Sequence, residues 1–222
     1  MSEVTAPGSD EVAARATEEN AFYHEAALNA AWTGSRLALG GLSFLFGSFA
    51  FAYFYLQSAN GHSLWLPKSN ALPQIGYGVA IMVLIVVSAV AQTVGLQRIK
   101  AGRKGAWATL ALVALVLGLV AVALQIVQLL NLPFQPGQSG FASVFVGFYP
   151  VALVTWLAAM IWLEILIVRA RRIPEISFVE QPPTYAQTFE IQRFQSSLSA
   201  FTLVWNYLAI VAFIFWLFFY VR

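Results

Sequence analysis

The sequence contains no cysteine, and only 10% of its 222 residues are charged. The lack of cysteine excludes disulfides, thiolate metal sites and thiol redox chemistry. The low charge content, with 59% of the residues hydrophobic, excludes a soluble domain with an ordinary polar surface. The N-terminus lacks the basic start and apolar stretch of a signal peptide, so we expect no cleavage there.

Long apolar runs dominate the sequence instead. They cover residues 37–57, 75–97, 106–130, 141–168 and 199–221. At about 1.5 Å rise per residue, each run is long enough as a helix to cross a hydrocarbon core of about 30 Å. The sequence therefore predicts an all-α integral membrane bundle of five transmembrane helices. We expect a multi-pass protein of a cell membrane, with a bacterial plasma membrane as the expected location.

The basic residues fall on alternate sides of these runs. Of the 12 Lys and Arg residues, only Lys68 and Arg222 lie on one side. The others lie in the opposite set of connections: Arg15, Arg36, Arg98, Lys100, Arg103, Lys104, Arg169, Arg171, Arg172 and Arg193. Because basic connections remain in the cytoplasm, this pattern predicts a cytoplasmic N-terminus and an external C-terminus. No basic groove lies outside the membrane, so no nucleic-acid partner is expected.

The chain divides into an acidic segment, residues 1–33, and a membrane domain, residues 34–222. Residues 1–18 carry few large apolar side chains and predict a disordered tail. Residues 19–33 predict a helix at the membrane surface, and 187–198 a second amphipathic helix. The outer connection 58–74 contains two prolines and predicts a stretch that is not helical throughout.

Ligands for a metal are scarce in the membrane domain. Neither His24 nor His62 lies in a span, and Met82 and Met160 are the only thioethers in the spans. A membrane haem or copper centre needs imidazole, thiolate or thioether ligands on rigid helices, so we expect this chain to bind no cofactor. Motifs of soluble enzymes are also missing. This chemistry favours a scaffold over a catalyst.

Few polar residues lie in the spans. Gln125 and Gln128, three residues apart, occupy one face of the third helix. They bond either to another helix of this bundle or to a partner helix, or they line a polar path. Gln92 and Gln97 lie near the end of the second span, and no role is expected for them. With so little polar content, the bundle is expected to depend on a partner surface.

Glu164 is the only carboxylate in a span. Acids within membranes suggest a proton relay or ion site. Glu164 nevertheless lies near Arg169 and Arg171, where snorkelling and ion pairing favour a structural role at an interface. In the fourth span, Pro150 predicts a bend in the helix.

In the last span, Trp205, Asn206 and Tyr207 form a further candidate contact. The amide of Asn206 is expected to bond to a neighbouring helix or to a lipid headgroup.

The order of these residues resembles subunit III of the haem–copper terminal oxidases, in its five-helix form. The first span ends in AYFYL at 52–56, and an outer loop with Trp65 and Pro67 follows. Further matching positions run across nearly the whole membrane domain: Pro73, Ser88, Ala91, Trp107, Gly118, Gln125, Phe219 and Tyr220. Most similar is the last helix, where Trp205-Asn206-Tyr207 stands in place of the family's Trp-His-Phe.

At several positions where the family has characteristic acids and histidines, this sequence has other residues. Its Ser-Glu pair falls near Gly41-Leu42, and its glutamate three residues after Gln125 is Gln128. Its Gly-Phe-His-Gly-Leu-His stretch remains only as GFYP at 147–150, and its last-helix histidine is Asn206. We therefore expect shape and partner docking to carry over from the family, but not the roles of those acids and histidines.

The resemblance implies a non-catalytic subunit of a respiratory terminal oxidase that packs beside subunit I and binds phospholipids. Haem and copper would then lie in subunit I, and subunit II would receive electrons. Two alternatives remain open from the sequence: an accessory subunit of a nitric oxide reductase or other respiratory complex, and a small membrane transporter. The electron donor, cytochrome c or quinol, and proton pumping are set by other subunits.

Overall fold

The protein is an all-α bundle, as predicted from the sequence. The computed structural model describes residues 9–67, 72–173 and 185–221, and no strand occurs among them. Its helices are α1 (Ser9–Trp65), α2 (Ile75–Lys100), α3 (Lys104–Leu130), α4 (Gly140–Arg172) and α5 (Tyr185–Tyr220). All 5 are long and apolar enough to cross a membrane, so the chain is a multi-pass membrane protein.

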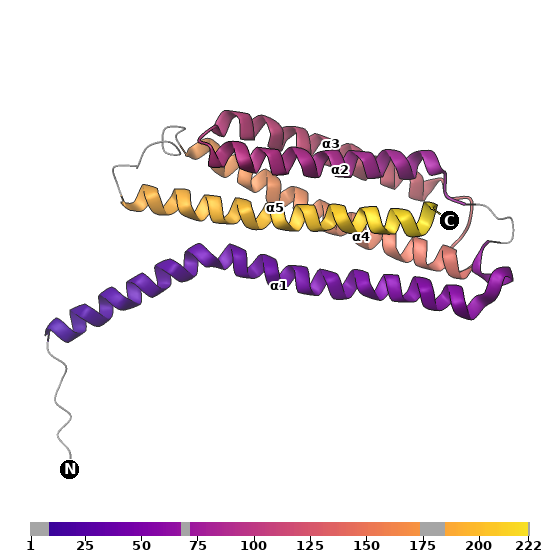
Figure 1. Ribbon diagram of the computed structural model, residues 1–222, viewed down its shortest axis with the longest axis horizontal. Coiled ribbons are helices and arrows are strands. Elements are labelled where there is room, and N and C mark those ends of the chain that lie inside the picture. The colour runs from indigo at the N-terminus through magenta and orange to yellow at the C-terminus, as the bar shows by residue number, and fades with distance from the viewer. Residues whose placement is uncertain (1–8, 68–71, 174–184, 222) are drawn as a thin grey trace, which may run out of the picture.

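The helices form three layers, with α4 and α5 in the middle (Figure 1). The pair α2 and α3 covers one side: α2 packs on α5, and α3 packs on α4. On the other side α1 contacts both α4 and α5. Successive spans run in opposite directions, so α1 begins and α5 ends at opposite ends of the bundle. This placement fits the predicted opposite sides for the two termini. Lys68 and Arg222 lie outside the described residues.

The first helix is longer than the sequence led us to expect, with 57 residues. The tail predicted over 1–18 is wrong from Ser9 onward, because 9–18 is rich in alanine, has no proline or glycine, and favours helix. Residues 1–8 lie outside the described part. At the other end α1 continues to Trp65, two residues before Pro67, which disfavours further helix. The outer connection is therefore shorter than 58–74.

The two predicted surface helices are continuous with spans. Residues 19–33 belong to α1, which changes direction and extends beyond the bundle (Figure 1). Residues 187–198 belong to α5. These two extensions pack on each other, because Ser196 Oγ donates to the carbonyl of Leu28 at 2.7 Å. The rings of His24 and Phe189 also meet, with centroids 3.8 Å apart.

An aromatic core joins α1, α4 and α5 at the end of the bundle opposite these extensions. Phe148 stacks on Phe215 with centroids 3.9 Å apart. Tyr53 meets Trp65 edge to face at 5.0 Å and donates its hydroxyl to the carbonyl of Phe218 at 2.6 Å. Aromatic pairs of this kind contribute about 0.5–1.5 kcal/mol each beyond burial. Such directional packing matters here, because lipid gives apolar helices no hydrophobic reason to associate.

Pro150 lies inside α4, which is helical on both sides of it. A bend at this residue stays a prediction. The turn between α3 and α4 is not helical, as its prolines and glycines indicate, and Gly137 adopts a φ of 83° there. A left-handed φ of this kind favours glycine.

The orientation in the membrane is testable because the native chain has no cysteine. We expect a membrane-impermeant maleimide to label Gln135→Cys in intact cells and to leave Ala101→Cys unlabelled. Both positions are exposed and lie in turns at opposite ends of the bundle. Permeabilised cells serve as the control, since both variants should then react. Labelling of Ala101→Cys in intact cells would reverse the predicted orientation.

Candidate functional site

Three polar side chains from different helices meet near the aromatic core, and we call them the tyrosine cluster: Gln128 of α3, Tyr149 of α4 and Tyr220 of α5. The amide of Gln128 donates to the hydroxyl of Tyr220. The hydroxyls of Tyr220 and Tyr149 lie 3.1 Å apart. On α2, Gly78 faces the ring of Tyr220, and a Cβ added there would clash with the Cζ atom of that ring. Four helices therefore meet at Tyr220.

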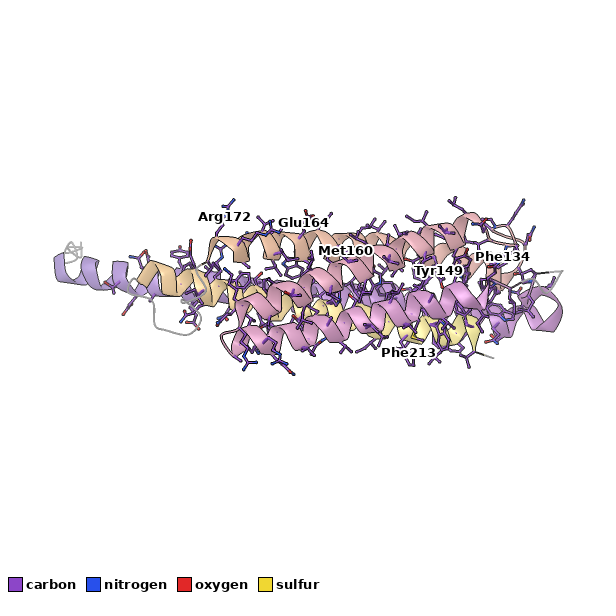
Figure 2. The ribbon with its side chains drawn as sticks, turned by 90° about the horizontal axis from the view of Figure 1, so that it is seen from above. Phe134, Tyr149, Met160, Glu164, Arg172 and Phe213 are labelled. Atoms are coloured by element: carbon purple, nitrogen blue, oxygen red, sulfur yellow. The ribbon has the colours of Figure 1, made fainter. Side chains whose placement is uncertain are left out.

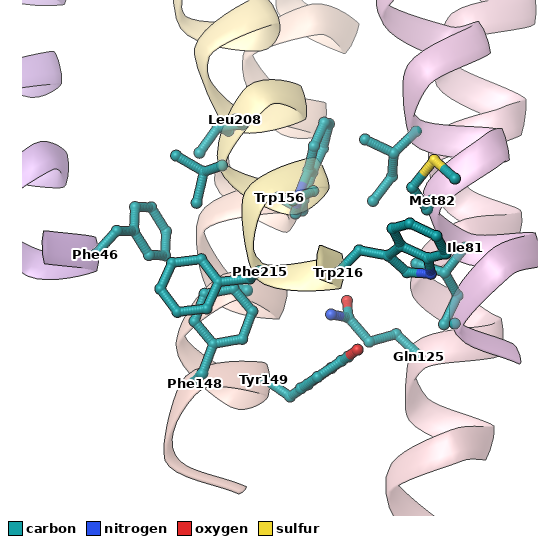
Figure 3. Close-up of a pocket in the computed structure, with 15 residues that line it drawn as sticks. Phe46, Ile81, Met82, Gln125, Phe148, Tyr149, Trp156, Leu208, Phe215 and Trp216 are labelled. Atoms are coloured by element: carbon teal, nitrogen blue, oxygen red, sulfur yellow. The ribbon is translucent and has the colours of Figure 1, made fainter. Parts of the chain in front are cut away.

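A small cavity lies beside the tyrosine cluster (Figure 3). Its walls include Gln125, Tyr149 and Trp216, and the amide of Gln125 points between the two aromatic side chains. The cavity measures about 30 Å³, which is room for one or two water molecules. Pockets for drug-sized ligands measure about 300–1,000 Å³. This cavity therefore suits water and no larger solute.

A second group of polar side chains, which we call the α2–α5 cluster, joins these helices halfway along the bundle. The indole nitrogen of Trp205 donates to Ser88 Oγ at 3.2 Å, and Ser88 Oγ donates to the carbonyl of Ala114 at 2.8 Å. The amide of Gln92 donates to Thr202 Oγ1 at 3.3 Å. Ser88, Gln92 and Trp205 are fully buried. These bonds fix the rotation of α5 against α2 and α3.

The α2–α5 cluster reaches the surface at Thr93 and Asn206. Asn206 Nδ2 donates to Thr93 Oγ1 at 3.0 Å. Both residues line a groove of about 620 Å³ between α2 and α5, whose other walls are apolar side chains such as Met82 and Phe213. Asn206 therefore bonds to a neighbouring helix, which is one of the two contacts expected for it.

The structure brings most of the sequence-predicted residues to helix interfaces. Gln125 and Gln128 are both buried on the inner face of α3. For Gln128 the geometry corresponds to a bond within this bundle, since its partner is Tyr220. The hydroxyl of Tyr207 donates to Ser43 Oγ on α1 at 2.9 Å. Trp205 packs against Trp156 of α4, with ring centroids 4.9 Å apart.

Two expectations from the sequence are corrected by these contacts. Gln92, for which no role was expected, is fully buried and bonds to Thr202. The bundle also has more internal polar bonds than expected, because serine, threonine and tyrosine hydroxyls supply them. A signal for this was available in the sequence: Ser88 and Gln92 are four residues apart, as are Thr202 and Asn206. Residues four apart share one helix face.

Glu164 is exposed on the outer side of α4 (Figure 2). It has no ion-pair partner in the part of the chain that the structure describes, so the expected pairing with Arg169 or Arg171 is absent there. The face of α4 that carries Glu164 is otherwise apolar. Its exposed side chains are Val154, Leu157, Ile161, Ile165 and Val168. Glu164 is thus the one carboxylate on a face otherwise suited to lipid or to another helix.

Within residues 9–67, 72–173 and 185–221 no group of three or more His, Cys, Asp or Glu side chains could hold a metal ion. No protein-family model matches the chain, and no curated protein matches it.

The bond between Trp205 and Ser88 allows a test of the α2–α5 cluster. We expect Ser88→Ala to destabilise the bundle by about 1–2 kcal/mol, because it leaves a buried indole N–H without an acceptor. Ser48→Ala is the matched control, since Ser48 is exposed and bonds only to its own helix, at the carbonyl of Phe44. The readout is the temperature at which a fluorescently tagged chain aggregates in detergent extract. Equal temperatures for both variants would refute the assignment.

The close contact at Gly78 allows a second test. We expect Gly78→Ala to cost about 1–3 kcal/mol through overpacking against Tyr220, whose ring is held by Gln128 and Tyr149. Gly76→Ala, two residues away in the same helix, has no atom within 4 Å of the new methyl group. This control should therefore be neutral or slightly stabilising in the same heating assay. If the two variants behave alike, α2 does not approach Tyr220 as closely as described.

Proposed function

We propose that this chain is a non-catalytic membrane subunit of a respiratory terminal oxidase, similar to subunit III. It packs beside a subunit I that holds haem and copper, in a complex with a subunit II that receives electrons. The role of the chain is to stabilise subunit I, and phospholipids bind in the apolar groove between α2 and α5. The order and spacing of the matching residues, from Trp65 to Tyr220, support the family assignment.

The positions of the resembling residues add support. Ser88, Gly118 and Trp205 lie together, since the indole of Trp205 bonds to Ser88 and passes within 3.6 Å of the Cβ position of Gly118. Trp65 is buried in the aromatic core. These residues all serve helix packing. A shared helix frame is the property that a structural subunit needs to fit its partner.

Two of the replaced family positions also lie close together. Gln128 stands where the family has a glutamate, and Tyr149 stands where it has a histidine. Both contact the hydroxyl of Tyr220. The two replacements thus fall in one cluster, where a neutral hydrogen-bonded group takes the place of an acid and an imidazole.

Glu164 is the observation that carries the proposed partner surface. A carboxylate in a membrane helix is costly when it faces lipid, by about 2.5–3.5 kcal/mol at the helix centre and by less toward its ends. Glu164 lies eight residues before Arg172, about 12 Å along the helix axis, and no side chain of the described part of this chain neutralises it. A partner helix with a cation or hydrogen-bond donor at this depth would compensate the carboxylate. The proposed surface is therefore the exposed face of α4.

The proposal predicts that the tagged chain, extracted in mild detergent, co-purifies with a haem protein visible in the absorption spectrum. We expect Glu164→Leu to lower the haem recovered by about 3–30-fold, the range that corresponds to about 0.6–2 kcal/mol for a polar contact between membrane helices. Glu164→Gln should lose less, because its amide still forms a hydrogen bond.

Glu25→Gln is the control for this experiment, since Glu25 is exposed on the extension of α1 outside the bundle. A wild-type chain that purifies as a stable monomer without haem absorbance would overturn the oxidase proposal. If the Glu164→Leu variant recovers as much haem as the wild type, the result supports the haem partner but refutes the exposed face of α4 as the contact surface. Oxygen or nitric oxide consumption by the recovered complex would separate an oxidase from a nitric oxide reductase.

A further inference from the structure

A basic pocket lies between the last turn of α4 and the first part of α5. It measures about 240 Å³. The residues that line it are Arg169, Arg172, Ile173, Glu190, Arg193 and Phe194. Phe194 is buried, and its ring meets that of Trp107 on α3, with centroids 5.6 Å apart. The floor of the pocket is therefore apolar and fixed by the bundle, while its rim is charged.

The charge of this pocket is strongly positive. Three arginines line it, together with a single acidic residue, Glu190. The ammonium of Lys104 adds a fourth cation at the edge, because it donates to the carbonyl of Ile173. Among the residues that the structure describes, none of the three arginines has an ion-pair partner. Positive charges around one pocket repel one another, so an anion bound in the pocket would lower the electrostatic energy.

The depth of the pocket in the membrane indicates which kind of anion could bind there. The candidate spans Gly140–Arg172 and Phe189–Tyr220 both end at this pocket. It therefore lies at the level of the lipid headgroups, on the side where most of the basic residues gather. The guanidinium group matches the geometry of phosphate oxygens and binds them with two parallel hydrogen bonds. Basic pockets between helices on this side of a membrane suit anionic lipid headgroups.

We propose that this pocket binds the phosphate group of an anionic ligand, with Arg169, Arg172 and Arg193 as its ligands. The phosphate comes from an anionic phospholipid or from free phosphate at the membrane surface. Ile173 and Phe194 contact the apolar part of a lipid ligand, and Glu190 weakens the binding by repulsion. This site rests on the membrane fold alone and not on an oxidase partner. It differs from the apolar groove between α2 and α5 in recognising charge.

Native mass spectrometry of the full chain in mild detergent tests the site, with phosphatidylglycerol and phosphatidylcholine as lipid probes. We expect R172Q/R193Q to weaken phosphatidylglycerol binding about 25-fold, which is about fivefold for each arginine removed at a membrane surface. The matched control is R98Q/R171Q, which removes the same charge from two exposed arginines outside the pocket. The affinity of this control variant for phosphatidylglycerol should change much less.

Glu190→Gln provides a variant that gains affinity. Removing this carboxylate should strengthen binding by about fivefold, through the same surface electrostatic effect. A role limited to folding would not produce a gain. Because the substituted residues are exposed and lie at the membrane surface, the variants should keep the elution profile of the wild type.

The source of the phosphate follows from which probe responds. Preference for phosphatidylglycerol over phosphatidylcholine, lost in R172Q/R193Q, identifies a lipid headgroup. Binding of inorganic phosphate by the lipid-free chain, measured by calorimetry and lost in the same variant, identifies free phosphate. The proposal is overturned if the pocket variant and the control bind all three probes alike. If the wild-type chain binds lipid but purifies without haem, the result would count against the oxidase proposal only.

Discussion

The whole bundle depends on how α5 is held among its neighbours. Lipid is as apolar as the helices, so burial of leucine or valine does not bring them together. What fixes α5 is directional contact: the indole of Trp205 bonds to Ser88, and the hydroxyl of Tyr207 bonds to Ser43. These bonds reach α2 on one side and α1 on the other. The three-layer order of the helices follows from them, because α5 contacts α1, α2 and α4.

The two ends of the bundle differ in chemistry. At one end the rings of α1, α4 and α5 enclose the tyrosine cluster, which is neutral and hydrogen-bonded, beside a cavity with room only for water. At the other end lie the basic pocket and Glu164, which has no partner in the described residues (Figure 2). The first end suits rigid packing. Charged side chains without an ion-pair partner in the described residues are concentrated at the second end. We place both the proposed partner contact and the proposed phosphate site there.

The residues that stand at the polar positions of the resembling family fit a structural role for this chain in the proposed complex. Where the resembling family has an acid and a histidine, this chain has Gln128 and Tyr149, which bond through Tyr220. A cluster of amide and phenol groups holds helices together through hydrogen bonds between uncharged side chains. Under the proposed function, the chain would keep the helix frame that fits its partner subunit. In the proposed complex, proton and electron chemistry belongs to the neighbouring subunits.

The sequence by itself determined the class and the spans, because hydropathy dictates which segments enter a bilayer. It put Gln125 and Gln128 on one face of α3, since residues three apart share a helix face, but the structure showed that this face is buried. The sequence missed the role of Gln92 and the helical start at Ser9. Only the tertiary structure decided which helices pair, that Glu164 is exposed, and that Arg172 and Arg193 share one pocket. The physical reason is that each helix can rotate about its axis and pack on any neighbour. Contacts between distant residues select one arrangement, and no local pattern encodes them.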